Sequence, residues 1–307
     1  MKHSLSITLI ILAIFLAAQF IGIGILYKYG YVKTMGAEKI VVKQTPGLQN
    51  PDLQSLGLDE KNPRDWIKAL IPLCVAILVG TGVLLLLIKL KLHLVWKAWF
   101  LIAVVTSLYK AMWVFLIPST LMAFSVALIL SLWKIFYPNV YIHNFTELFI
   151  YGGLAAIFVP LFNVWSVSIL LIFIALYDAY AVWHSKHMVT LAKSQAEAKV
   201  FAGLLIPYKL PKNTIPKSKK APATIHVKTK VRTAILGGGD IGFPLMFAGV
   251  VMKELGLWQS LIIPFFALLG LGILLFIAKE DKFYPAMPFI SGGCLLGLSV
   301  VWLIGAI

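Results

Sequence analysis

Long apolar stretches recur along the whole chain, and they restrict the fold more than any other feature of the sequence. Hydrophobic residues make up 60% of the 307 positions and charged residues only 13%, which excludes an ordinary soluble globular protein. A helix needs about 20 mainly apolar residues to cross a bilayer. Stretches of about this length occupy residues 5–27, 69–89, 97–117, 119–136, 145–162, 164–184, 233–254, 258–278 and 284–306. The sequence therefore predicts an all-α polytopic membrane protein with about nine transmembrane helices; eight remain an alternative if 97–136 is divided differently.

The basic residues are concentrated in one loop, and their placement predicts the orientation of the chain. The net charge is +15, and 11 of the 27 Lys and Arg residues lie between Lys186 and Arg232. Cytoplasmic loops of membrane proteins carry the excess of Lys and Arg, so we expect this loop to be cytoplasmic. With the N-terminus on the same side, the C-terminus is extracytoplasmic, in a multi-pass protein of the cell membrane. Charge placed in this way indicates membrane topology rather than nucleic-acid binding.

The same loop divides the chain into three parts. These are an N-terminal six-helix part at 1–184, a basic cytoplasmic loop at 185–232 and a C-terminal three-helix part at 233–307. Within the loop, residues 200–206 form a short apolar run that Pro207 ends. From residue 225 to residue 231 apolar and polar residues largely alternate, which is typical of a half-buried strand. We therefore predict a small β-hairpin between the sixth and seventh helices; a disordered basic linker is the alternative.

Two aspartates draw attention because they lie well inside apolar stretches. Of the 12 acidic residues, we expect only Asp178 and Asp240 to lie at membrane depth. A carboxylate there costs about 2.5 kcal/mol or more, so it marks a functional site by default. Asp178 lies six residues before the end of the sixth stretch, and Asp240 lies seven residues after the start of the seventh. Neighbouring antiparallel helices would then place both carboxylates roughly 9–11 Å from the cytoplasmic boundary.

Two carboxylates at one depth can act as an acid–base pair. Carboxylates held close together share one proton and titrate as a unit. In aspartic proteases one carboxylate takes a proton from water while the other donates a proton to the substrate. Gly237, Gly238 and Gly239 are expected to weaken the helix before Asp240 and to let another backbone approach it. Tyr177 is placed to donate a hydrogen bond near the pair.

Three short motifs in a fixed order resemble a known family. They are Tyr177-Asp178, Gly237-x-Gly239-Asp240 and Pro285-Ala286-Met287-Pro288. Together with the topology, these motifs resemble the presenilin and signal-peptide-peptidase family of intramembrane aspartyl proteases, and in particular its prokaryotic, archaeal-like branch. Methionine at 287 stands where the family carries leucine, a change that conserves volume and apolar character.

The resemblance implies a set of roles and partners. Asp178 and Asp240 would be the catalytic pair, Gly237 and Gly239 would support Asp240, and residues 285–288 would lie beside the site and help engage the substrate. The substrates would be transmembrane segments of proteins, or signal peptides, within the lipid bilayer, and no cofactor is implied. The charge placement matches the orientation of presenilins. Presenilins need accessory subunits and signal peptide peptidases do not; we expect this chain to act without an obligate accessory subunit.

The sequence also leads to expectations about how a substrate binds and about alternative functions. A transmembrane substrate has to unwind before its backbone can be cleaved, and we expect the strand around Val227 to pair with it while the Pro285 region offers free carbonyls. A proton-coupled transporter or ion channel is the alternative, because it also uses intramembrane carboxylates. The sequence shows no internal repeat that would favour it. His184 and His187 lie one turn apart without a nearby acid or cysteine, so no metal site is predicted.

Overall fold

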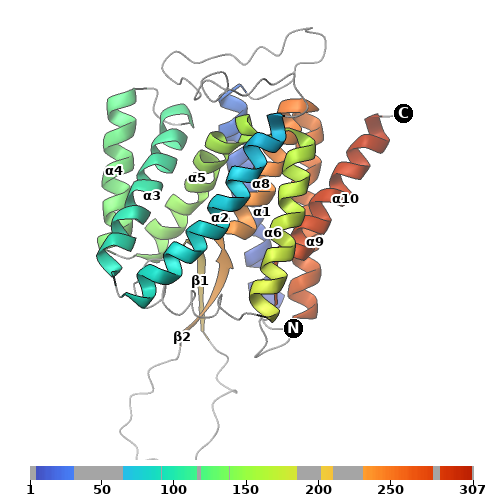
Figure 1. Cartoon of the computed structure of the whole chain (residues 1–307). Coiled ribbons are helices and arrows are strands. Elements are labelled where there is room, and N and C mark those ends of the chain that lie inside the picture. Colours follow the sequence, from blue (N-terminus) through green and yellow to red (C-terminus); the bar gives the residue numbers. More distant parts are fainter. Residues whose placement is uncertain are drawn as a thin grey trace, which may run out of the picture.

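The computed structural model describes residues 5–30, 65–90, 92–115, 119–137, 139–184, 202–209, 231–278 and 284–305. Within these residues nine α-helices form a bundle in which successive helices run in opposite directions, with a small hairpin at one end (Figure 1). The helices are α1 (Leu5–Lys28), α2 (Asp65–Lys89), α3 (His93–Phe115), α4 (Thr120–Phe136), α5 (Val140–Phe158), α6 (Val164–Trp183), α8 (Gly238–Glu254), α9 (Leu257–Ile277) and α10 (Met287–Gly305), with a 3-10 turn η1 (Val159–Leu161) after α5. The predicted all-α polytopic fold is confirmed.

Most of these helices have the length and composition of membrane spans. Six qualify among the described residues, at Leu5–Lys28, Leu94–Val114, Val140–Leu161, Val164–Trp183, Leu257–Ile277 and Met287–Gly305. Helix α4 is apolar but has only 17 residues. Large hydrophobic side chains cover the outside of the bundle; Leu94, Leu121 and Trp258 are each more than 75% exposed. An apolar exterior of this kind is what a lipid environment requires.

Small residues bring neighbouring helices into close contact. A Cβ atom at Gly153 would fall on the backbone carbonyl of Ser107, so α5 and α3 pack backbone against backbone. A Cβ atom at Gly270 would likewise fall on the carbonyl of Phe289, where α9 meets α10. Close packing through small residues is a usual way in which helices associate inside membranes, where the hydrophobic effect between helices is absent.

Hydrogen bonds join the start of α6 to the end of α8, at the end of the bundle far from the hairpin. The α6 N-terminus carries a capping box, in which Ser166 N donates to Asn163 Oδ1 at 2.7 Å. The backbone N–H of Val164 donates to Glu254 Oε2 at 3.1 Å, and Lys253 Nζ donates to the carbonyl of Phe162 at 2.9 Å. These bonds tie the start of α6 to the end of α8, and thereby fix the relative position of their opposite ends.

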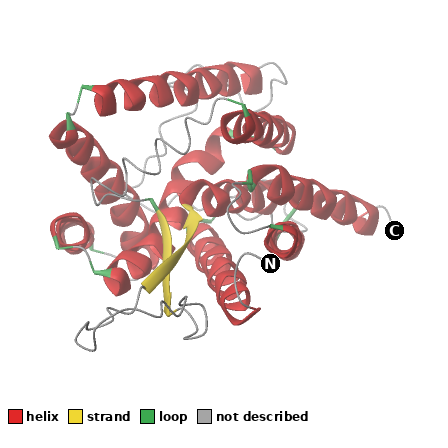
Figure 2. Cartoon of the chain, turned by 90° about the horizontal axis from the view of Figure 1, so that it is seen from below, coloured by secondary structure: helices red, strands yellow, loops and turns green. Residues whose placement is uncertain are grey.

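The hairpin consists of β1 (Gly203–Lys209) and β2 (Val231–Gly237), paired antiparallel. Figure 2 views the molecule from this end and shows the two strands crossing the ends of the helices. Side chains of α5 hold β1 in place. Asn144 donates from Nδ2 to the Leu205 carbonyl at 2.7 Å and accepts the Leu205 N–H at 2.9 Å, and His143 Nε2 lies 2.7 Å from the Gly203 carbonyl. The predicted hairpin between the sixth and seventh helices is present.

The boundaries of the hairpin differ from the predicted ones. The first strand does not end at Pro207 but continues to Lys209. The N–H and C=O of Leu205 point away from β2, because both bond to Asn144. These groups alternate in direction along a strand, so those of Pro207, two residues later, also point away from β2. The missing N–H of Pro207 therefore removes no bond between the strands. The apolar residues 233–237 were expected to open the seventh span, and this was wrong, because they form β2 instead. Residues 225–230, the larger part of the expected second strand, and Val227 with them, lie outside the described residues.

Candidate active site

Asp178 and Asp240 lie at the same end of two packed antiparallel helices. Asp178 is in the last two turns of α6 and only 6% exposed, whereas Asp240 is in the first turn of α8 and partly exposed. Asp178 is close enough to act electrostatically on Asp240. The expectation that Asp240 lies two turns inside its helix was wrong, because α8 begins at Gly238. The reason is the strand: apolar residues that would have lengthened the helix pair with β1 instead.

The three glycines before Asp240 form the junction between β2 and α8. Gly237 is the N-cap of the helix, with extended backbone angles and no side-chain cap, and a Cβ atom there would lie 2.9 Å from Asp240 Oδ2. Gly238 donates its backbone N–H to the carbonyl of Ala202 at 3.1 Å. A Cβ atom at Gly238 would lie 3.2 Å from that same carbonyl oxygen. The expected close approach of another backbone therefore occurs at Gly238.

A residue of α1 that was not predicted as part of the site supports the first turn of α8. Gln19 is fully buried, and its Nε2 donates to the carbonyl of Ile241 at 2.9 Å. Pro244 lies one turn after Asp240 and has no N–H, so the carbonyl of Asp240 lacks its helical partner. The bond from Gln19 therefore reinforces a turn in which one backbone bond is missing. A single Gln in an apolar stretch is the only sequence signal of this contact.

The Pro-Ala-Met-Pro segment lies against Asp178. The backbone N–H of Met287, at the start of α10, donates to Asp178 Oδ2 at 3.1 Å. The first N–H groups of a helix have no partner inside it and favour negative charge, so a carboxylate fits this position. The carbonyl of Ala286 accepts the N–H groups of Phe289 and Ile290 at 3.2 and 3.1 Å. The expectation that this corner offers free carbonyls was therefore wrong for Ala286, because α10 uses that oxygen.

The other residues considered in the sequence are Tyr177, His184 and His187. The ring of Tyr177 stacks on Phe173, with ring centroids 6.5 Å apart. His184 ends α6 and is exposed, whereas His187 lies outside the described residues. Among the residues that the structure describes, no three His, Cys, Asp or Glu side chains come together as metal ligands. The absence of a metal site stays a prediction.

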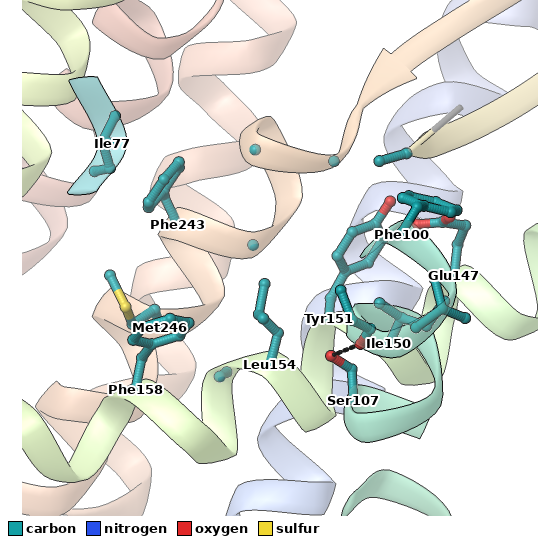
Figure 3. A pocket seen from close by; sticks show the side chains of 17 residues that line it. Ile77, Phe100, Ser107, Glu147, Ile150, Tyr151, Leu154, Phe158, Phe243 and Met246 are labelled. Atoms are coloured by element: carbon teal, nitrogen blue, oxygen red, sulfur yellow. Dashed lines mark hydrogen bonds between the residues drawn. The ribbon is translucent and has the colours of Figure 1, made fainter. Parts of the chain in front are cut away.

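A cavity of about 360 Å³ adjoins the glycine junction (Figure 3). It is formed by α2, α3, α5 and the start of α8, and Gly238, Gly239 and Phe243 belong to its wall. Most of its wall is apolar, contributed by side chains such as Ile77, Phe100, Leu154, Phe158 and Met246. A cavity with these dimensions has room for amino-acid side chains beside Asp240.

A third acid, Glu147, is buried on the cavity wall, although only two acids were expected at membrane depth. Glu147 is two turns into α5, is 1% exposed and pairs with the buried Lys134 of α4. Lys134 Nζ also lies 3.4 Å from Thr146 Oγ1. The predicted span at 145–162 begins only two residues before Glu147, so this acid was not expected at membrane depth. The structure instead buries it between helices, where a cation from α4 is in reach.

A family model and two solved structures are similar to this chain. A family model described as signal-peptide peptidase, presenilin aspartyl protease matches residues 39–307. No curated protein matches the chain. A solved structure of a presenilin family intramembrane aspartate protease in space group C222 superposes with a TM-score of 0.61 at 19% sequence identity, covering 97% of this chain and 99% of that chain. A structure of a presenilin family intramembrane aspartate protease in space group P2 gives a TM-score of 0.59 at 19% identity and covers 99% of each chain.

Proposed function

The chain belongs to the signal-peptide peptidase and presenilin family of aspartyl proteases, and we propose that Asp178 and Asp240 are its catalytic pair. The protein is thus an intramembrane aspartic protease, a hydrolase embedded in a membrane. One observation supports the assignment: two acidic side chains lie at the same end of the packed helices α6 and α8. A proton-coupled transporter is disfavoured by the family membership.

The pair would hydrolyse a peptide bond by general acid–base catalysis. One carboxylate removes a proton from the attacking water while the protonated partner gives its own proton to the carbonyl oxygen. The first carboxylate then passes the proton from water to the leaving amine, and the partner recovers its proton from the tetrahedral intermediate as the C–N bond breaks. Because the two groups act as a unit, the proton they share is assigned to the pair rather than to either residue. The N–H of Met287 fixes the orientation of Asp178 by holding Oδ2. The catalytic geometry then depends on α10 as well as on α6 and α8.

Conservative substitution of each aspartate tests this assignment. We expect Asp178→Asn and Asp240→Asn each to abolish cleavage of a single-span model substrate by the purified protein, while gel filtration shows a folded protein. Glu254→Gln is the matched control, because it makes the same chemical change at the far end of α8 and keeps an oxygen acceptor for Val164 N–H. Cleavage near the wild-type rate in either aspartate variant would exclude the assignment. An aspartyl-protease transition-state inhibitor should block the wild-type reaction.

The outer edge of β2 is where an unwound substrate would bind. Leu205 lies opposite Ile235, and its N–H and C=O both bond to Asn144 rather than to β2. In an antiparallel ladder, residues facing each other direct their peptide groups either both inward or both outward. The N–H and C=O of Ile235 therefore point to the outer side of β2, where the described residues supply no further strand. Adding an extended segment to a free strand edge is a common form of peptide recognition.

A proline at this edge tests the binding mode. Ile235→Pro removes an outward N–H and is expected to raise KM for the model substrate without unfolding the hairpin, because no bond between the strands is lost. Ile235→Val is the matched control and should leave KM unchanged. Unchanged KM in the proline variant would contradict substrate pairing at β2. Val227→Pro, at a position outside the described residues, is likewise expected to impair cleavage.

The hairpin end of the bundle would face the cytoplasm of the cell. The N-terminus lies at this end and the C-terminus at the other (Figure 1). Helix α6 ends and β2 begins at the hairpin end, so the basic segment between 186 and 232 is attached at this end of the bundle. The positive-inside rule places such a segment in the cytoplasm. Ser119, before α4, lies at the opposite end and is exposed. A membrane-impermeant thiol reagent should label Ser119→Cys but not His184→Cys in intact cells, and the reverse would overturn this orientation.

The substrates would be membrane-spanning segments of other proteins or signal peptides, and the chain would cleave them without an accessory subunit. The cavity beside Gly238 opens among apolar side chains, which suits side chains of a transmembrane segment. Cleavage by the purified chain alone, in detergent or lipid, tests this proposal. If activity appears only after membranes are added back, an accessory component is needed.

A further inference from the structure

The ring of Tyr151 packs against the start of α8. Gly238 and Gly242 are one helical turn apart, so both lie on one face of α8. A Cβ atom at Gly238 would lie 3.2 Å from Cε1 and 3.3 Å from the hydroxyl oxygen of Tyr151, and one at Gly242 would lie 3.9 Å from Cδ1. Tyr151 is only 3% exposed. Because the two glycines carry no side chains, the ring packs closely against the helix backbone.

The backbone that the ring touches is the one that carries Asp240. Asp240 follows Gly238 by two residues, and residues two apart on a helix do not face each other. Tyr151 therefore contacts the turn beneath Asp240, although it is near enough to interact with the carboxylate electrostatically. Gly238 also donates its N–H to the carbonyl of Ala202 at 3.1 Å. The hairpin and the ring of Tyr151 together confine the start of α8.

The orientation of Tyr151 depends on a buried carboxylate. Glu147 precedes Tyr151 by one turn of α5, and a hydrogen bond joins the two side chains, which Figure 3 shows next to each other. An ionised carboxylate only accepts, so the hydroxyl of Tyr151 is the donor. Lys134 Nζ donates to Oε1 of the same carboxylate, and both charged residues are buried. Lys134 thus holds Glu147, and Glu147 holds the hydroxyl of Tyr151.

The hydrogen bonds between α5 and the hairpin involve other side chains. His143 Nε2 lies 2.7 Å from the carbonyl of Gly203, and Asn144 bonds to the N–H and C=O of Leu205. These bonds remain when the hydroxyl of Tyr151 is removed. The outer edge of β2, where the substrate is proposed to bind, and the position of Asp240 therefore depend on different side chains of α5.

We propose that Tyr151 is a positioning residue for Asp240, and that Glu147 and Lys134 act through it. The bond to Glu147 fixes the ring, the ring fixes the start of α8, and the start of α8 sets the position of Asp240 relative to Asp178 and the attacking water. A small displacement of a catalytic group lowers the rate of the chemical step even when its cause lies outside the reacting groups. This inference rests on the proposed catalytic pair and names residues outside the pair that control its geometry.

Removing only the hydroxyl gives the first test. In the full-length purified protein, Tyr151→Phe is expected to lower kcat for a single-span peptide about tenfold, with KM unchanged. The Tm should fall by only about 2 °C, the effect of one hydrogen bond. Tyr141→Phe is the matched control: its ring is on the same helix but 86% exposed, so neither kcat nor Tm should change. A wild-type kcat in Tyr151→Phe would overturn the proposal, and so would a loss that lies entirely in KM.

The variant Lys134→Met/Glu147→Met separates positioning from stability. It removes the acceptor of the Tyr151 hydroxyl without leaving an unpaired charge, so its Tm should stay within about 3 °C of the wild type. Measured well below the Tm of every variant, its kcat should nevertheless fall about tenfold.

Adding Tyr151→Phe to this double variant should cause no further loss of kcat, because the hydroxyl no longer has the partner through which it acts. A role in stability alone predicts that kcat recovers together with Tm. The proposal fails if the double variant has a wild-type kcat, or if the losses multiply in the triple variant.

The proposed catalytic pair is judged separately in the same assay. Asp240→Asn must abolish cleavage, whatever the result for Tyr151. An active Asp240→Asn refutes the pair and, with it, the positioning role. An inactive Asp240→Asn together with a wild-type kcat in Tyr151→Phe refutes only the role of Tyr151.

Discussion

The buried ion pair between Lys134 and Glu147 gives a stability prediction whose size follows from the structure. The two side chains are 2% and 1% exposed, and they join α4 to α5 inside the bundle. Removing one partner of a buried pair leaves an uncompensated charge and costs about 3–5 kcal/mol, whereas replacing both by apolar residues is often neutral. Lys134→Met and Glu147→Met should therefore each destabilise the protein. The double variant should recover most of the loss.

The neighbours of each charge rank the two single variants. After Lys134→Met, the carboxylate of Glu147 still has His143 Nε2 at 3.9 Å. After Glu147→Met, the ammonium of Lys134 keeps only the Thr146 hydroxyl at 3.4 Å among the contacts described. We therefore expect Glu147→Met to be the less stable variant.

Thermal unfolding in detergent, followed by tryptophan fluorescence, measures these differences. At about 2 °C per kcal/mol for a protein of this size, each single variant should lower Tm by about 6–10 °C. The double variant should unfold within about 3 °C of the wild type. Single variants with wild-type Tm would refute the reasoning, and so would a double variant as unstable as the worse single one, because no coupling between the two charges would then exist.

Three further predictions concern the backbone around α8. Gly237→Ala places a Cβ atom 2.9 Å from Asp240 Oδ2, whereas in Gly239→Ala the atom nearest to the new Cβ is a Phe243 ring carbon at 3.5 Å. We expect kcat to fall roughly tenfold or more in Gly237→Ala and to change little in Gly239→Ala. Equal activities of the two variants would contradict this prediction. Gln19→Leu should lower kcat roughly tenfold with little change in Tm, because only the support of α8 is lost. Gly256, between α8 and α9, has φ 124° and ψ 172°, so Gly256→Ala should cost about 1–3 kcal/mol of unfolding free energy, measured by Tm.

Local patterns in the sequence were sufficient to predict the helices and to identify Asp178 and Asp240 as the candidate pair. Runs of about 20 apolar residues can only be satisfied as helices in a bilayer, because every backbone group must bond within the segment. Asp178 and Asp240 were found because a carboxylate inside such a run is expensive. The hairpin was predicted in the correct loop, but its strands were misplaced by several residues. Residues 233–237 are equally suited to the start of a span and to a strand, and pairing with β1 decides between them.

Contacts between distant segments could not be predicted in the same way. Gln19 supports Ile241 across 222 residues of sequence, and Lys134 neutralises Glu147 across a turn between two helices. The pattern of residues along the sequence does not show such pairs, because their interaction energy depends on which helix faces lie opposite each other. The polar wall of the cavity at Tyr151 has the same origin.

The sequence by itself determined that the chain is an all-α polytopic membrane protein, and it predicted a basic loop between six helices and three, with one aspartate on each side of the loop. These properties follow from transfer free energies of single residues and segments, which need no knowledge of neighbours. Only the tertiary structure decided that α8 begins two residues before Asp240, that the N–H of Met287 holds Asp178, and that Glu147 is buried beside the cavity. Each of these depends on packing between helices, where the partner of every buried polar group is chosen.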